Sequence, residues 1–315
     1  MLKINIKNKK EFKCVGNEVV NLIIEIVSKR KDEWFDRKKK KKLNQTNKEK
    51  REIEVFLNSL TPEYIEELVF LKPDKLRQNA LNFASEKRSE ALNDFIKSIF
   101  NATYKNHFLR RRFIEAIGLK TCPYCNRAYV YTIEDGEINP QIDHFYYKAK
   151  YPLFAVSLYN LIPACSVCNS AGAKGQRDTL LGDYSTHSPH ETDDSEFRFN
   201  YKLLSPAIIK GTKRLTDSDV KILLDSKNDV YDKLFHITSL YEQHVDHIVD
   251  LLYKRKYVYN NETLEFLRRL TGKNLKRATL DRFIVGAYVE INNYHKRPLS
   301  KMYTEIAKEI KLIPK

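Results

Sequence analysis

Residues 121–174 read TCPYCNRAYVYTIEDGEINPQIDHFYYKAKYPLFAVSLYNLIPACSVCNSAGAK, and this stretch decides how the rest of the chain is interpreted. Two Cys-x-x-Cys pairs enclose most of it: Cys122 with Cys125, and Cys165 with Cys168. Four thiolates suit a tetrahedral Zn²⁺ ion with no open coordination position, which is the arrangement of a structural site. Two unrelated thiol pairs and a redox motif are the alternatives. We predict a structural Zn²⁺ site whose binding free energy contributes to folding.

The composition is that of a globular protein of 315 residues with 42% hydrophobic content, enough for two or three structural units. Its formal net charge of +15 suits a partner with a phosphate backbone, although chains from AT-rich genomes also carry many lysines. No apolar run reaches the length of a membrane span, and the N-terminus lacks the apolar core of a signal peptide. We expect a cytoplasmic protein without a membrane segment. Because four of the five cysteines are clustered, a disulfide framework is disfavoured.

Three regions are predicted from the change in apolar spacing along the chain. Residues 1–117 form a helical N-terminal region, 118–180 a central module, and 181–315 a mainly helical C-terminal region. The N-terminal region contains six consecutive basic residues, 37–42, which suit either a solvated segment or an arm that grips phosphates. The predicted fold class is α+β.

Within the C-terminal region, residues 197–201 alternate like a short strand. Thr216–Leu224 begins with a cap and acidic residues and is predicted to start a helix. Asn228–Arg255 has a long helical pattern. His244 and His247 share one face of that pattern, where we expect a packing or surface role.

The central module is predicted to contain strands, one long loop and a short helix. Ala128–Ile133 and Ile138–Phe145 have strand character, and Leu158–Ala164 supplies the next strand. The loop Tyr146–Ser157 separates the last two strands, and a helix begins at Ser166.

Four residues of the module suit acid–base and metal chemistry. His144 has an ordinary pKa that lets it accept a proton at neutral pH. Asp143 offers oxygen to a hard cation, and such a cation would stabilise the charge that develops on a phosphoryl group. Asn169 offers a neutral second oxygen ligand, and Asn160 is placed to hydrogen-bond His144 or to pin the loop. An isolated Asp-His pair is more often structural, so its position between two Cys-x-x-Cys pairs is the informative feature.

This constellation resembles the HNH endonuclease family, the ββα-metal nucleases, in its cysteine-flanked form. The family pattern is CxxC, Asp-His, Asn-Leu, CxxC, Asn or His, and Lys-Gly. The matching residues are the four cysteines with Asp143-His144, Asn160-Leu161, Asn169 and Lys174-Gly175. The resemblance implies a small zinc-stabilised ββα-metal module between two mainly α-helical regions. It implies His144 as general base, Asp143 and Asn169 as ligands of Mg²⁺ or another divalent ion, and Asn160 as an orienting residue.

The same segment is similar to HNH proteins of bacterial anti-phage defence systems, such as the nuclease partner in Septu and retron-type loci. That resemblance implies an ATPase partner subunit, and the first hypothesis is hydrolysis of phosphodiester bonds in DNA. One active site would nick one strand, so double-strand cuts would need a dimer, that is a homo-oligomer, or two events. Cleavage of RNA or tRNA keeps the same chemistry and stays open. So does a non-catalytic zinc module that binds nucleic acid or acts as a scaffold.

Four basic residues in or beside the module are predicted to contact nucleic acid: Arg127, Lys148, Lys150 and Lys174. His187 and His190 follow the module and are candidates to join the site.

Overall fold

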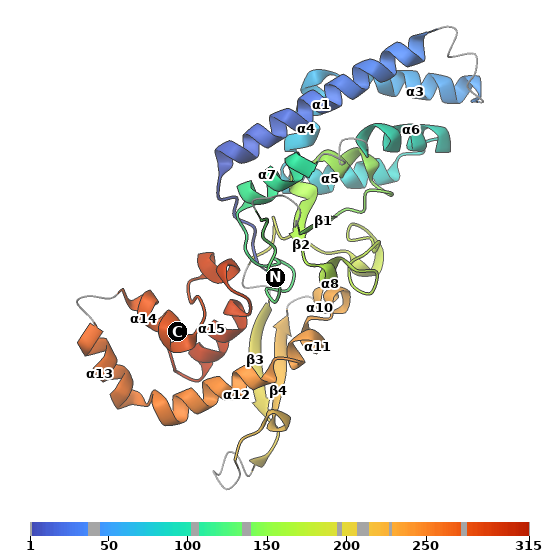
Figure 1. Ribbon diagram of the computed structural model, residues 1–315. Coiled ribbons are helices and arrows are strands. Elements are labelled where there is room, and N and C mark those ends of the chain that lie inside the picture. The colour runs from blue at the N-terminus through green and yellow to red at the C-terminus, as the bar shows by residue number, and fades with distance from the viewer. Residues whose placement is uncertain are drawn as a thin grey trace.

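The computed structural model describes residues 2–36, 45–101, 107–133, 140–193, 197–206, 214–226, 229–271 and 276–314. Across these ranges the protein is mostly helical with two small antiparallel sheets (Figure 1), so the predicted α+β class is confirmed. The predicted basic segment 37–42 lies outside the described residues. No helix within the described ranges is both long enough and apolar enough to cross a membrane.

Helices build the N-terminal region, the blue and green part of Figure 1. They are α1 (Lys9–Phe35), α3 (Asn47–Ser59), α4 (Pro62–Phe70), α5 (Pro73–Ser85), α6 (Glu90–Phe100) and α7 (His107–Ile117). Local chemistry sets several of their starts. Thr46 and Glu49 form a reciprocal capping box at α3, and Thr61 caps α4 with Pro62 in its first turn. Their apolar faces meet in one core that includes Ile23, Ile53 and Phe100.

The central sheet consists of β1 (Gln141–His144) and β2 (Leu161–Ala164), paired antiparallel so that His144 faces Leu161. Two 3₁₀ turns, η2 (Pro152–Val156) and η3 (Leu158–Asn160), lie in the connection, and the four-residue helix α8 (Ser166–Asn169) follows β2. The predicted strand Leu158–Ala164 therefore begins as a 3₁₀ turn.

The predicted strand Ala128–Ile133 is wrong. This segment makes one isolated bridge, between Thr121 and Tyr129. The two hydrogen bonds that flank this bridge, from Cys122 N to Ala128 O (2.9 Å) and from Val130 N to Lys120 O (2.9 Å), close the loop that carries the first cysteine pair.

A second hairpin, β3 (Phe197–Leu203) and β4 (Val220–Ser226), stands in the C-terminal region. The helix predicted for Thr216–Leu224 is wrong. Thr216 and Asp219 do form a capping box, but it serves only the 3₁₀ turn η5 (Asp217–Asp219). The chain then becomes a strand that buries Val220 and Ile222, because alternate apolar residues gain more from a sheet face than from a helix here.

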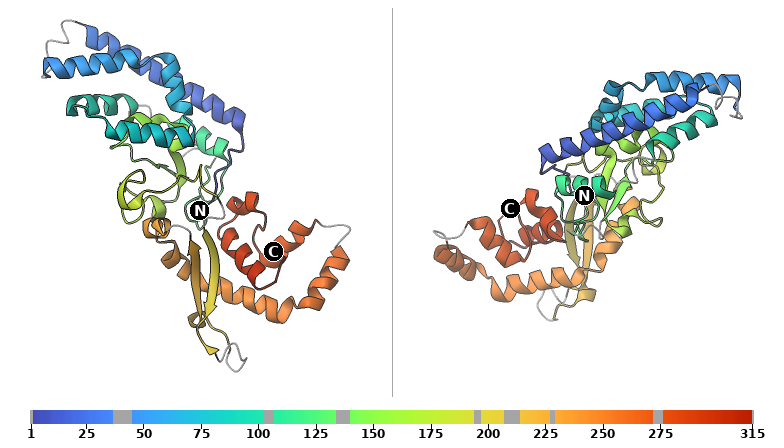
Figure 2. Two further views of the ribbon diagram at one scale, coloured as in Figure 1. Left: turned by 180° about the vertical axis from the view of Figure 1, so that it is seen from behind. Right: turned by 45° about the horizontal axis from the view of Figure 1, so that its top comes forward.

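Short helices make up the rest of the C-terminal part of the chain. They are η4 (Gly182–Tyr184), α10 (Val230–Phe235), α11 (Ile237–Glu242), α12 (Val245–Tyr253), the π-helix η6 (Lys254–Val258), α13 (Asn261–Thr271), α14 (Arg277–Val285), η7 (Ile291–Lys296) and α15 (Ser300–Glu309). Helix α15 packs on β3, whereas α11 and α12 pack on β4, as both views in Figure 2 illustrate.

The predicted helical pattern Asn228–Arg255 is divided into separate helices. His236 takes a left-handed conformation (φ 52°) and donates its backbone N–H to Asp232 O (2.7 Å), which ends α10. The Asp232 carboxylate then accepts the backbone N–H of Thr238 (2.7 Å) in the first turn of α11. The apolar residues keep their helical spacing through this turn. The spacing alone therefore does not show that the chain changes direction.

Candidate functional site

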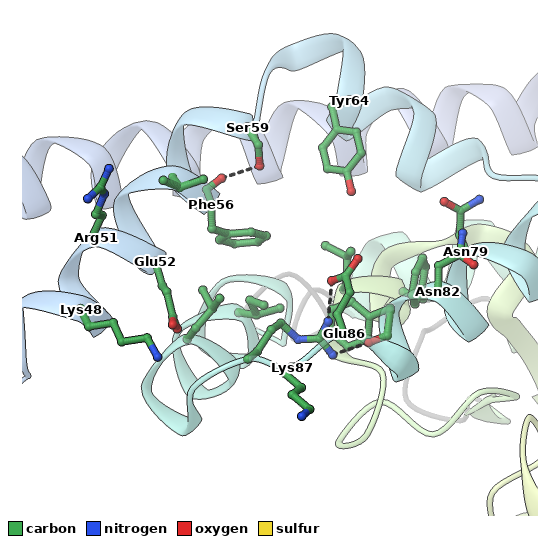
Figure 3. A pocket seen from close by; sticks show the side chains of 17 residues that line it. Lys48, Arg51, Glu52, Phe56, Ser59, Tyr64, Asn79, Asn82, Glu86 and Lys87 are labelled. Atoms are coloured by element: carbon green, nitrogen blue, oxygen red, sulfur yellow. Dashed lines mark hydrogen bonds and ion pairs between the residues drawn. The ribbon is translucent and has the colours of Figure 1, made fainter.

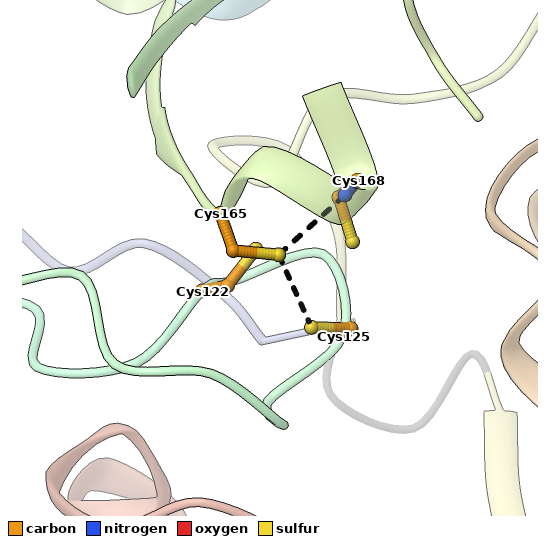
Figure 4. Close-up of side chains that lie close together, drawn as sticks. All are labelled: Cys122, Cys125, Cys165 and Cys168. Carbon is orange, nitrogen blue, oxygen red and sulfur yellow. Dashed lines mark hydrogen bonds between the residues drawn. The ribbon is translucent and has the colours of Figure 1, made fainter. Parts of the chain in front are cut away.

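The four cysteines form one compact cluster (Figure 4). All are buried and their sulfur atoms lie within 4.8 Å of one another. The Cys125 and Cys165 sulfurs are 3.9 Å apart. A tetrahedral ion with Zn–S bonds of about 2.3 Å would place its ligands about 3.8 Å apart, so the spacing fits. The predicted metal cluster is confirmed as a site that could hold an ion such as Zn²⁺.

Two features of the surroundings act in opposite directions on thiolate ligands. Backbone N–H groups point at two sulfurs, from Arg127 to Cys125 (3.4 Å) and from Cys168 to Cys165 (3.5 Å). Burial raises the pKa of the Cys122 thiol well above its ordinary value, so a cation is needed to keep this buried group deprotonated. These residues fit a structural Zn²⁺ ion that is closed to solvent.

Asp143 is buried between the two cysteine loops and has partners on both carboxylate oxygens. Tyr124, inside the first Cys-x-x-Cys motif, donates its hydroxyl to Oδ2 (2.6 Å). Lys174, which follows the second motif, lies 3.2 Å from Oδ1 and also donates to the backbone carbonyl of His144 (2.9 Å). Lys174 is 0% exposed. The prediction that it contacts nucleic acid is therefore wrong, because its ammonium is buried in this ion pair.

The predicted Mg²⁺ site receives no support from this arrangement. The Lys174 ammonium already neutralises Asp143, and the Asn169 amide donates to Gln141 Oε1 (2.8 Å) at the other end of β1. Among the described residues, the cysteine cluster is the group of three or more candidate ligands that comes together. A hard divalent ion prefers several oxygen ligands, and Asp143 and Asn169 as arranged do not supply them.

His144 is 6% exposed, at the end of β1. Burial lowers its pKa to about 3, and the positive charges of Lys148 and Lys174 add to the effect. A hydrogen bond between the ring and the backbone of Ala155 acts in the opposite direction. The imidazole is therefore neutral at pH 7 and is held by the loop.

Asn160 pins the loop that holds His144. Its side-chain amide donates to Phe154 O (2.9 Å) and Tyr146 O (3.2 Å), and its carbonyl accepts from Tyr146 N (2.8 Å). The side chain is 0% exposed. Of the two predicted roles for Asn160, the structure displays the pinning of the loop, so Asn160 is a positioning residue.

The other basic candidates lie in different surroundings. Lys148 is half-buried and close enough to His144 to affect its pKa. Lys150 is exposed and pairs with Asp178 (2.5 Å). Arg127 is half-buried and donates to His244 Nε2 (3.0 Å), so it faces the C-terminal region.

The other histidines singled out in the sequence lie in different surroundings. His190 lies behind β2, with Nε2 3.4 Å from Leu161 O and its ring edge-on to Tyr159. His187 is exposed. His247 continues the chain of contacts from His244 to the Tyr303 hydroxyl (2.8 Å). None of them belongs to a group of candidate metal ligands among the described residues.

A cleft of about 680 Å³ opens between α3, α5 and α6 (Figure 3). Its lining mixes Lys48, Arg51 and Lys87 with carboxylates and aromatic rings. It reaches the central module only through Leu153 and Phe154 of η2. The cleft and the Asp143–His144 site are therefore separate features.

Three residues of the site had no signal in the sequence. Tyr124 lies at a variable position of its Cys-x-x-Cys motif, Ala155 acts through its backbone, and Gln141 acts only as the partner of Asn169. Comparison with protein-family models, with curated proteins and with solved structures found no match. A proposal for function therefore depends on the residues and their geometry.

Proposed function

We propose that this protein is an HNH-type endonuclease that hydrolyses phosphodiester bonds in DNA, with His144 as the general base. The observation that carries the proposal is a neutral histidine at the end of β1, fixed by the loop and lying beside two lysines. The order β1, pinned loop, β2, α8 and the enclosing cysteine cluster further support it.

In this reaction a water oxygen attacks phosphorus while His144 accepts the proton. The bond from phosphorus to the leaving oxygen breaks, and that oxygen takes a proton from solvent. A base with a pKa of about 3 is correctly deprotonated but weak. An anionic phosphate beside the ring would offset the repulsion from Lys148 and Lys174 and raise that pKa in the complex.

Mg²⁺, when bound in enzymes of this class, stabilises charge on the phosphoryl group. Since Asp143 is paired with Lys174, we assign it no step here. The cleavage experiment described below therefore compares buffers with and without a divalent ion. An ATPase partner and a role in anti-phage defence rest on the sequence resemblance and belong to the same proposal.

A second candidate is a zinc-dependent nucleic-acid-binding or scaffold module without catalysis. The burial of Asp143, Lys174 and Tyr124 favours it, because these groups join the two cysteine loops as a structural network. Such a protein would need the cysteines and exposed basic residues but not the His144 imidazole.

The deciding experiment compares wild type, His144→Ala and the matched control His187→Ala, whose ring is exposed just after the module. Supercoiled plasmid and a structured RNA are incubated with each protein in Mg²⁺, in Mn²⁺ and in chelator-treated buffer. We expect wild type and His187→Ala to cleave DNA, and His144→Ala to lose cleavage while retaining zinc and DNA binding. Equal cleavage by His144→Ala would refute the assignment. DNA binding without cleavage by wild type would favour the second candidate.

A further inference from the structure

Three positive charges converge on one aromatic ring in the C-terminal region. The Arg282 guanidinium carbon lies 5.1 Å from the centroid of the Tyr288 ring, Lys296 Nζ lies 5.4 Å from it, and the Arg297 guanidinium carbon 5.7 Å. All are within the range of a cation–π contact. We call these four residues the Tyr288 cluster. It joins the end of α14 to the end of η7.

The cluster is held rigidly from beneath. The Tyr288 backbone accepts from Thr304 Oγ1 (3.1 Å) and donates to Ser300 Oγ (3.3 Å), and both of these α15 residues are buried. Arg297 donates to the carbonyl of Gly286 (2.5 Å), which takes a left-handed conformation at the end of α14. These hydrogen bonds fix the backbone of Tyr288 and the side chain of Arg297, so the ring and this cation are preorganised.

No carboxylate of the described residues neutralises these cations. Within the described part of the chain, none of Arg282, Lys296 and Arg297 forms an ion pair, although Lys301 nearby pairs with Glu305 (2.9 Å). Glu290, close in sequence, accepts instead from the Asn293 amide. Like charges held at one ring repel each other, and an anion bound among them would relieve that repulsion.

The positive surface continues beside the cluster. Lys7, Lys120 and Lys296 all act electrostatically on His295, whose ring is buried and bonds to no other described residue. His295 also lines a small cleft that Lys7 and Lys3 share. Segments from the start of the chain, from the approach to the first cysteine pair, and from η7 thus present cations on adjoining surface.

The loop of the first Cys-x-x-Cys motif connects this surface to the central module. Asn126, next to Cys125, donates its amide to the carbonyls of Tyr294 (3.1 Å) and Arg297 (3.5 Å). Its own backbone carbonyl accepts from Leu299 N (2.6 Å). The segment that carries Lys296 and Arg297 is therefore fastened to the loop that binds the metal.

We propose that the Tyr288 cluster is a binding surface for the phosphate backbone of a nucleic acid. This goes beyond the proposed function, since it places polymer binding on a surface apart from His144 and requires no cleavage. Arginine with its fork of donors suits phosphate oxygens, and Lys296 adds a point charge. A polymer held there by several phosphates would release counterions, so its affinity would fall steeply with salt.

The test measures binding of a fluorescein-labelled 20-base-pair DNA and its single strand by polarisation, over a range of salt concentrations. All proteins carry His144→Ala, so that cleavage does not interfere. The triple substitution Arg282→Gln, Lys296→Gln, Arg297→Gln is expected to weaken binding about tenfold or more, and to reduce the slope of log K against log salt by about two to three.

A control triple removes the same charge from exposed lysines of the N-terminal region: Lys72→Gln, Lys75→Gln and Lys87→Gln. It is expected to weaken binding by less than about threefold, since only general attraction is lost. The single substitution Lys296→Gln changes one exposed residue, so it keeps the test valid if the triple variant fails to fold. It is expected to reduce the slope of log K against log salt by about one. Equal losses in both triples, or no loss in either, would overturn the proposal. So would equally tight, equally sensitive binding of poly-glutamate, which would indicate an acidic protein partner.

Discussion

Removing the Asn160 side chain is the sharpest test of how the loop around His144 is held. Asn160→Ala would leave the amide and carbonyl of Tyr146 and the carbonyl of Phe154 without their partner, in a place that is 0% exposed. At about 1 kcal/mol for each hydrogen bond, the free energy of unfolding should fall by about 3 kcal/mol. If no water reaches the freed groups, the loss rises toward about 5 kcal/mol.

Urea unfolding followed by circular dichroism measures this difference, and amide hydrogen exchange locates it. The Tyr146 amide, which bonds to the Asn160 side chain, should exchange faster in Asn160→Ala. The Phe145 amide bonds to the Asn160 backbone carbonyl (2.8 Å) and should change much less. Asn169→Ala is the matched control, since it removes one half-exposed bond to Gln141 and should cost less than about 1 kcal/mol. If both variants lose equally little and Tyr146 stays protected, the loop is held by something other than Asn160.

Two further predictions concern buried ionisable groups. Lys174→Met should destabilise the fold by about 3–5 kcal/mol, because Asp143 would be left buried without a counter-charge. Adding Asp143→Asn should recover part of that loss in a double-mutant cycle, and strictly additive losses would contradict the pairing. His190 has its pKa lowered to about 4 by burial, so the unfolded chain, with a pKa near 6.5, binds the proton first as pH falls. Stability should therefore drop between about pH 6.5 and pH 4, by up to about 3 kcal/mol, and His190→Gln should flatten this slope in denaturation curves.

The metal cluster and the short helix after it were predictable because their signals are local. Paired cysteine spacing specifies a tetrahedral site wherever it falls in a fold. Ser166 follows Cys165, whose sulfur accepts from the Cys168 backbone in the first turn of α8. The general α+β class followed from long helical patterns around a short stretch of different character.

The errors arose where distant contacts override local signals. A capping box at Thr216 suggested a helix, yet pairing with β3 makes the following residues a strand. Lys174 looked like a surface cation because lysine is seldom buried unpaired. Its partner Asp143 is 31 residues away, and only the meeting of the two cysteine loops brings the pair together. The same meeting turned a predicted Mg²⁺ ligand into half of an ion pair.

The cysteine cluster fastens more than its own module. Tyr241 of α11 donates its hydroxyl to Cys125 O (2.6 Å), and Leu2 at the start of the chain donates to Pro123 O (2.8 Å). Both bonds depend on the conformation of the first Cys-x-x-Cys loop. If an ion held by the four cysteines fixes that loop, its removal should loosen the N-terminal segment and the C-terminal helices together.

Cys165→Ser tests this, because it removes a ligand from the second loop and leaves Tyr241 and Leu2 untouched. A structural Zn²⁺ ion in this cluster would contribute on the order of 10 kcal/mol to folding, so its loss should open the contacts that depend on the first Cys-x-x-Cys loop. We expect zinc content near zero by elemental analysis and rapid amide exchange at Leu2, with Ile65 in α4 as the internal reference, since its amide bonds to Thr61 O (3.0 Å) within the N-terminal helices. Cys14→Ser, at a half-buried cysteine of α1 outside the cluster, is the matched control and should retain zinc and native exchange. A folded, zinc-free Cys165→Ser protein with Leu2 still protected would mean that hydrogen bonds alone hold the two regions to the loop.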